Sequence, residues 1–236
     1  MRYLIQSALR LDPNCVGAIE AQAFLEAQTR GELIAGLERA VEAGERALGA
    51  EYFDEHRGDF WKLPETRPYM EALNALAINY KLDHRYNDAI EVYERMMDLN
   101  PFDDQCIRYR LLLLYLTVRN QSAVRTMMAK MHNDNTAFFA WSRVLERLLA
   151  GDNVAAAVEL NKARQANPYV EQYLIEKIPL PGEPPPRCAL GSREEAELCV
   201  FELFVIWKDN KEAFYWIFDQ LNPGHSVKVA SSQLLP

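Results

Sequence analysis

Two short runs of apolar residues with helical spacing, separated by a polar turn and closed by a proline, constrain the fold of this chain most. The positions concerned are Leu73, Leu76, Ala77, Tyr80, Ala89, Tyr93 and Pro101. Each run can form a helix with one apolar face, and the turn folds the two helices into a hairpin. A hairpin of this kind cannot bury its own apolar face, so it must stack on neighbouring hairpins. The sequence therefore predicts an all-α fold.

The same pattern recurs along the chain. Ala123 and Met127 follow Ala89 and Tyr93 by 34 residues. Small and aromatic residues at this interval are typical of the tetratricopeptide repeat, which the chain resembles. The resemblance implies a tetratricopeptide-repeat superhelix (an α-solenoid), here with a C-terminal helical cap. It also implies that the first helix of each hairpin lines a concave groove.

Breaks in the pattern divide the chain into six predicted segments. Glycines and prolines bracket an aromatic stretch that interrupts the repeats, and five of the twelve prolines lie in a second stretch, which cannot be helical. The sequence opens with a single predicted helix where a complete hairpin would have two. Either this helix caps the stack by itself, or further residues precede it and complete the hairpin. The segments are 1–48 (N-terminal helices, a partial repeat plus one repeat-like hairpin), 49–68 (aromatic insertion), 69–173 (tetratricopeptide repeats), 174–191 (proline-rich connector), 192–222 (C-terminal helical pair) and 223–236 (weakly ordered tail).

Four stretches resemble a narrower group, the bacterial branch of the suppression-of-tumorigenicity family of tetratricopeptide proteins. They are residues 60–70, 100–109, 167–170 and 191–196. The most specific string among them is Glu65-Thr66-Arg67-Pro68-Tyr69-Met70. The resemblance implies a helical-repeat interaction protein and brings no enzymatic activity with it.

Composition limits the partners and the location. A net charge of −8 argues against a general nucleic-acid binder, which needs a basic face. The longest apolar run, residues 111–118, is far shorter than the ~20 residues that cross a bilayer. The N-terminus lacks the pattern of a secretory signal, so we expect a cytoplasmic protein. The four cysteines have no paired spacing and are interpreted as buried small hydrophobes in a reducing compartment, in preference to disulfides or metal ligands.

No motif in the chain indicates chemistry. The four histidines are far apart, and no nucleotide-binding or nucleophile-elbow motif occurs. Acidic pairs such as Asp103-Asp104 stand where helices are expected to begin, which capping explains. We therefore predict no catalytic residue, no metal ligand, no cofactor and no enzyme. The alternative is an enzyme or regulatory module with a site between the insertion at 52–67 and the solenoid, for example at His56, Asp59 and Arg67.

The predicted binding surface mixes aromatic, cationic and amide side chains on the first helices of successive hairpins. Such a groove suits an extended or helical peptide with apolar anchors and some negative charge. The aromatic members can equally be core residues at helix contacts. The predicted partner-binding residues are Glu71, Asn74, Ile78, Lys81, Gln105, Arg108, Tyr115, Phe138 and Trp141.

The final two predicted helices are dense in large aromatic side chains. These side chains can cap the stack by packing on the preceding repeat, or they can form a homodimer contact. The expected function is therefore a non-catalytic adaptor or scaffold for a protein or peptide, with a self-assembling structural protein as a further alternative. The aromatic residues are Phe201, Phe204, Trp207, Phe214, Trp216 and Phe218.

Overall fold

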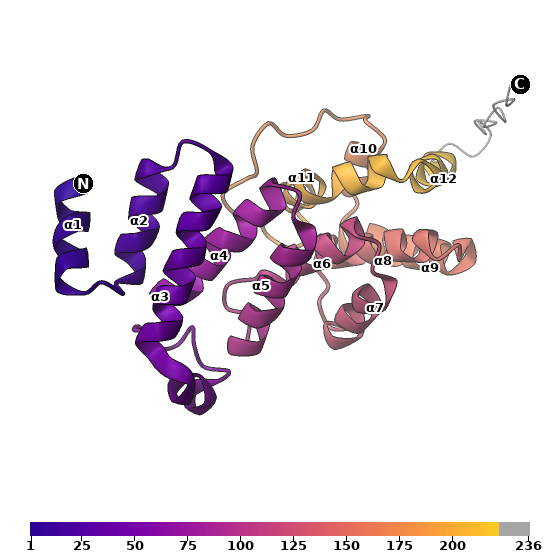
Figure 1. Cartoon of the computed structure of the whole chain (residues 1–236). Coiled ribbons are helices and arrows are strands. Elements are labelled where there is room, and N and C mark those ends of the chain that lie inside the picture. Colours follow the sequence, from indigo (N-terminus) through magenta and orange to yellow (C-terminus); the bar gives the residue numbers. More distant parts are fainter. Residues whose placement is uncertain (222–236) are drawn as a thin grey trace, which may run out of the picture. The chain divides into compact units, whose positions relative to one another are not determined.

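The computed structural model describes residues 1–221 (Figure 1). Every regular element in these residues is an α-helix, which confirms the predicted all-α class. No helix among them is both long and apolar enough to cross a bilayer. The chain divides into two compact units, the first ending at Val118 and the second beginning at Arg119. The tail predicted for residues 223–236 lies outside the described residues.

Unit 1 is built from two antiparallel hairpins, α2–α3 and α4–α5, with α3 also packed on α4 and α6 packed on α5. Both hairpins are confirmed where the sequence predicted them. The helices of unit 1 are α1 (Arg2–Leu11), α2 (Val16–Glu26), α3 (Arg30–His56), α4 (Arg67–Leu82), α5 (Tyr86–Leu99) and α6 (Ile107–Thr117).

Small residues allow the helices of unit 1 to approach closely. A Cβ atom built on Gly36 would lie 2.4 Å from the Cβ of Ala23 on α2. A Cβ atom on Gly44 would lie 2.5 Å from the ring of Tyr69 on α4. Both distances are too short for real atoms, so glycine at these two positions brings α3 against its two neighbours.

The predicted insertion at 49–68 is partly helical. Residues 50–56 continue α3 beyond a kink at Gly49, whose φ of 77° and ψ of 157° suit glycine alone. Farther on, Phe60 is completely buried, with its ring stacked on that of Phe53 at a centroid distance of 4.9 Å. The Phe53 ring in turn meets Tyr69 edge-on at 5.4 Å. The aromatic cluster therefore packs onto α3 and α4.

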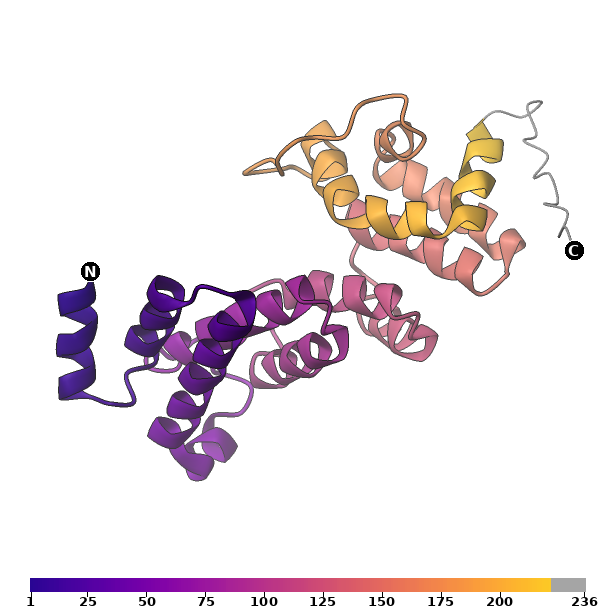
Figure 2. The ribbon, with the colours of Figure 1, turned by 45° about the horizontal axis from the view of Figure 1, so that its top comes forward.

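Unit 2 is organised around α8, which contacts α7, α9, α11 and α12. Figure 2 shows the C-terminal helices (yellow) beside the pink helices of this unit. The rings of Trp141 on α8 and Trp207 on α11, both completely buried, meet at a centroid distance of 6.3 Å. The C-terminal pair thus packs on the preceding hairpin as the cap interpretation predicted. The helices of unit 2 are α7 (Gln121–Lys130), α8 (Ala137–Leu149), α9 (Asn153–Ala166), α10 (Val170–Leu174), α11 (Arg193–Asp209) and α12 (Lys211–Leu221).

The buried carboxylate of Glu195 joins three parts of unit 2. The Ser192 hydroxyl caps the start of α11 by accepting the Glu195 backbone N–H at 3.1 Å. The carboxylate does not return to Ser192, however. It accepts the backbone N–H groups of Gly191 at 2.7 Å and of Ala137, the first residue of α8, at 2.9 Å. It also accepts the side-chain amide of Asn167 at 3.0 Å. One side chain therefore fixes the start of α11 against the start of α8.

The unit boundary falls inside the segment predicted as continuous repeats. α6 and α7 both lie within that segment, but they belong to different units. α8 finds its main packing partners in α9 and in the C-terminal pair. The hairpins α2–α3, α4–α5 and α8–α9 are established, whereas a continuous superhelix over 69–173 is not.

The prediction that all four cysteines are buried is confirmed for Cys199 alone; Cys15 is half-buried, and the other two are exposed. Cys199 on α11 is buried as expected, and burial raises the pKa of its thiol well above the ordinary value. Cys106 and Cys188 are exposed instead. The reason is that α6 begins one residue after Cys106, so this cysteine stands in the preceding turn, while Cys188 lies in the irregular connector before α11.

Candidate functional site

Four predicted contact residues share one face of α4, and each keeps part of its surface exposed. Asn74 accepts a hydrogen bond from Arg110 of α6 at 3.3 Å, a neighbour that sequence reasoning missed. Glu71 lies near Glu20 of α2; burial first, and the negative charge of Glu71 second, raise the pKa of Glu20. This surface of unit 1 is therefore polar and of mixed charge. The four residues are Glu71, Asn74, Ile78 and Lys81.

Two other predicted residues stand at the start of α6. Gln105 was expected on this helix but precedes it, since α6 begins at Ile107. Arg108 donates to the carboxylate of Asp103 at 2.8 Å and lies 4.3 Å from the centroid of the Tyr109 ring. Asp103 is buried and also accepts the Ile107 N–H at 2.5 Å. The Arg108 charge is thus balanced within the fold, where it helps to fix the start of the helix.

The three aromatic residues of the predicted surface lie in the core instead. Tyr115 on α6 is buried, and its hydroxyl donates to Glu94 at 2.6 Å. Phe138 and Trp141 on α8 are 8% and 0% exposed. The physical reason in unit 2 is that the C-terminal pair covers the face of α8 that the repeat pattern would leave for a ligand. The core alternative therefore describes these three side chains, and they do not belong to an exposed contact surface.

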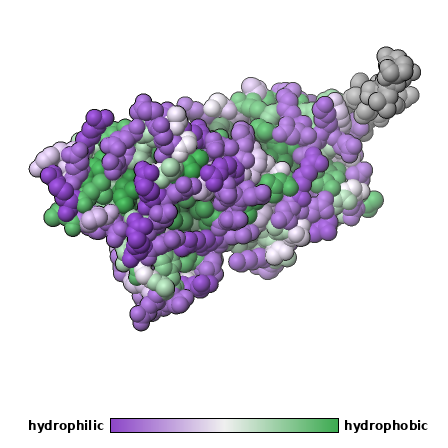
Figure 3. All heavy atoms as spheres, in the orientation of Figure 1, coloured by the Kyte–Doolittle hydropathy of each residue, from purple (hydrophilic) through white to green (hydrophobic). Residues whose placement is uncertain are grey.

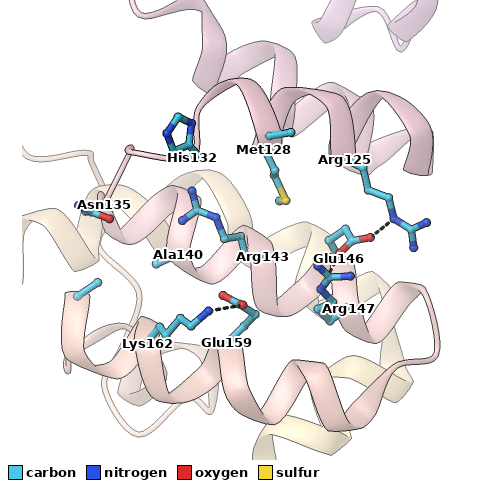
Figure 4. Close-up of a pocket in the computed structure, with 12 residues that line it drawn as sticks. Arg125, Met128, His132, Asn135, Ala140, Arg143, Glu146, Arg147, Glu159 and Lys162 are labelled. Atoms are coloured by element: carbon cyan, nitrogen blue, oxygen red, sulfur yellow. Dashed lines mark hydrogen bonds and ion pairs between the residues drawn. The ribbon is translucent and has the colours of Figure 1, made fainter.

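A cleft of about 560 Å³ lies between α7, α8 and α9 of unit 2 (Figure 4). Figure 4 shows charged side chains from all three helices around it. Apolar atoms of Met128 and Ala140 form part of its wall. The charged residues that line it are Arg125 of α7, Arg143, Glu146 and Arg147 of α8, and Glu159 and Lys162 of α9.

The amphipathic pattern of α8 explains which side chains reach the cleft. Arg143 and Arg147 are one helical turn apart, so they project from the same face, and Glu146 lies between them. These are the charged residues of α8, and Trp141 and Leu145 lie in the core. Sequence reasoning missed the cleft because it followed the repeat register to the aromatic positions. The clustering of every charge of α8 within residues 143–147 was the available signal.

The cleft carries more positive than negative charge. Glu146, whose side chain is 3% exposed, pairs with two guanidinium groups, Arg125 at 2.7 Å and Arg147 at 3.4 Å. Lys162 pairs with Glu159 at 2.7 Å. The lining residues thus include four cationic side chains and two carboxylates, an excess of two positive charges with histidine neutral. A basic surface of this kind stands out on a chain whose net charge is −8.

The partners of Arg143 are neutral. Its guanidinium donates to the backbone carbonyl oxygens of Met131 and Asp134, each at 3.2 Å, and so holds the turn between α7 and α8. A guanidinium group has five N–H donors in a planar fork, and two arginines sharing one carboxylate use only part of that capacity. His132 and Asn135 add polar groups on the same side of the cleft (Figure 4). The arrangement can bind a carboxylate or phosphate group beside an apolar side chain.

The residues of the enzymatic alternative have separate partners. Asp59 pairs with Lys62 at 2.6 Å, and Arg67 donates to the carbonyl oxygen of Trp61 at 3.1 Å. The backbone N–H of Asp59 donates to the carbonyl oxygen of His56 at 3.0 Å, but within residues 1–221 no side-chain hydrogen bond or ion pair joins His56, Asp59 and Arg67 to one another. Their side chains do not form a shared polar site in this structure.

Comparisons of the chain with known proteins identified no relative. No family model matches the chain, and neither a curated protein nor a solved structure matches it significantly. The described fold and its side chains are therefore the basis for a functional proposal.

Proposed function

We propose that the chain is a non-catalytic, cytoplasmic adaptor of the tetratricopeptide-repeat type that binds an acidic peptide segment of a protein partner. The cleft between α7, α8 and α9 is its proposed contact site. Stacked helical hairpins commonly present such surfaces to extended peptides. The observation that carries the proposal is the excess of cationic side chains around this cleft in an acidic chain.

Charge complementarity supports an acidic ligand. Arg125 and Arg147 converge on the single carboxylate of Glu146 and retain donors for a second acceptor. A ligand carboxylate placed beside them would complete a balanced network, since each guanidinium group can donate a planar pair of hydrogen bonds to it. A basic ligand would instead add to the positive excess. The cleft therefore discriminates by the sign of the ligand charge.

The size and wall of the cleft support a peptide side chain or two. Ligand pockets commonly measure about 300–1,000 Å³, and the 560 Å³ cleft lies in this range. Met128 offers a flexible apolar surface, which adapts to aliphatic partners of different shape. The proposed ligand is thus an acidic peptide that carries an aliphatic anchor, in agreement with the ligand class expected from the sequence.

The test compares short fluorescent peptides containing Glu and Leu with matched peptides containing Lys and Leu. Fluorescence anisotropy measures their binding to the full chain and to the double variant Arg147→Gln, Lys162→Gln. The control is Lys177→Gln, Lys211→Gln, which removes two exposed charges elsewhere in unit 2. We expect the acidic peptide to bind and the cleft variant to weaken its affinity at least about tenfold. The control should change it less than about twofold.

Added salt should weaken binding to the wild type more than binding to the cleft variant, because fewer charge contacts remain in the variant. Circular dichroism confirms that the variants keep their helix content. Equal loss of affinity in the cleft and control variants would contradict the site. Equal binding of acidic and basic peptides would contradict the proposed ligand class.

A further inference from the structure

The outer face of α11 carries an apolar stripe that nothing within the described residues covers. Leu198, Phe201 and Val205 are 37%, 44% and 62% exposed, although the opposite face of the helix is buried against α8 and α10. In Figure 3, apolar (green) atoms are visible over the region where α11 and α12 run in Figure 1. Exposed apolar stripes on a helix mark contact surfaces.

The stripe forms part of a longer, regular pattern. Glu194, Leu198, Phe201, Val205 and Lys208 are separated by four, three, four and three residues. This is the spacing of a helix seam that packs against another helix. The three central positions are apolar, and the two ends carry opposite charges. The seam can therefore pack against a second helix that has apolar residues at its centre and charges opposite to these at its two ends.

We propose that this seam is a homodimer contact in which α11 packs antiparallel on α11 of a second copy. Phe201 is the centre of the pattern, because Glu194 lies seven residues before it and Lys208 seven residues after it. A twofold axis at Phe201 places Glu194 of each copy opposite Lys208 of the other. Leu198 of each copy then faces Val205 of the other copy. One surface thus supplies both halves of a self-complementary contact.

Charge selects the antiparallel arrangement. In a parallel pair, Glu194 would face Glu194 and Lys208 would face Lys208, and both contacts are repulsive. Hydrogen bonds from its own backbone N–H and from Ser192 lower the pKa of Glu194, which keeps the carboxylate charged. Lys208 is more than half exposed and pairs with Glu176 at 3.0 Å. Exposed pairs of this kind rearrange readily, so Lys208 can reach a second copy.

The expected dimer is weak. α11 has 17 residues, which corresponds to a length of about 25 Å, and a single helix pair buries a small area. The apolar stripe supplies the affinity, whereas the ion pairs set the orientation. Self-association is therefore expected at micromolar and higher concentrations rather than at nanomolar ones.

Sedimentation equilibrium over about 1–500 µM full chain tests the contact. The wild type should move from the mass of one chain towards the mass of two. Glu194→Lys and Lys208→Glu should each raise the dissociation constant at least about fivefold, since each creates two like-charge contacts across the axis. The double variant Glu194→Lys, Lys208→Glu should restore association, because it exchanges the signs and keeps the complementarity.

Two further variants distinguish association through the stripe from nonspecific hydrophobic association. Phe201→Glu should abolish dimerisation by placing two carboxylates together on the axis. Val158→Glu, at a 52% exposed position of α9, should leave dimerisation unchanged. A wild type that stays monomeric at all concentrations would overturn the proposal and assign the stripe to another occupant. Failure of the double variant to restore association would overturn the antiparallel pairing.

Discussion

Replacing Glu195 with alanine is expected to destabilise unit 2 strongly while leaving unit 1 unchanged. The carboxylate of Glu195 is buried and accepts hydrogen bonds from three donors, the backbone N–H groups of Ala137 and Gly191 and the amide of Asn167. Alanine keeps the helix propensity of this position but removes the acceptor. All three donors are then left without their partner in a region that is poorly accessible to water.

The magnitude follows from these three bonds. A hydrogen bond to a charged group contributes about 1.5–3 kcal/mol, so a simple sum for Glu195 reaches about 4.5–9 kcal/mol. Water entering the space left by the side chain recovers part of this loss. We therefore expect Glu195→Ala to lower the free energy of unfolding by about 3–5 kcal/mol, a large share of the ~5–15 kcal/mol typical of a native protein. Glu195→Gln keeps the shape but places an N–H₂ group among donors, so it should cost about 1–3 kcal/mol.

Urea denaturation followed by tryptophan fluorescence and circular dichroism measures the effect. Trp141 and Trp207 are completely buried in unit 2, so their fluorescence reports on the unit that holds Glu195. Glu212→Ala, an exposed position in the first turn of α12, is the matched control and should change stability by less than about 0.5 kcal/mol. A loss below about 1 kcal/mol for Glu195→Ala would refute the argument that this carboxylate joins α8 and α11.

Two further predictions concern unit 1. Gly36→Ala should lower the free energy of unfolding in urea by about 1–3 kcal/mol, because its Cβ would lie 2.4 Å from that of Ala23. Gly17→Ala, which meets nothing within 4 Å, should raise it by about 0.5–1 kcal/mol; equal effects would contradict this packing. Burial first, and the hydrogen bond to Glu94 second, raise the pKa of Tyr115, so its contribution to stability is present at neutral pH and is lost as pH rises above about 10. Tyr115→Phe should therefore lose less stability than the wild type between about pH 9 and pH 11, and identical alkaline profiles would exclude this linkage.

The cleft could be anticipated only in part. The charges of Arg143, Glu146 and Arg147 define the polar face of α8 from the sequence alone, because helical spacing places them together. Arg125 and Lys162, which also line the cleft, come from other helices. No local sequence pattern predicts that these helices enclose a shared cleft of about 560 Å³. The sequence therefore predicts the α8 wall of the cleft, whereas the walls from α7 and α9 depend on how the helices pack.

The same division explains Phe138 and Trp141. Their spacing correctly predicts one apolar helix face, but an apolar face can serve a ligand or a core equally well. The choice depends on whether another segment covers it, and here α11 and α12 do so from positions more than fifty residues away.

The sequence by itself determined the all-α class and the hairpins α2–α3 and α4–α5. These features depend on residues close together in the chain, where helical periodicity, turns and caps act directly. Only the tertiary structure decided the unit boundary at Arg119, the burial of the α8 aromatic face and the three-way role of Glu195. Contacts between distant segments create these features, and their energy depends on which surfaces meet in space rather than on local spacing.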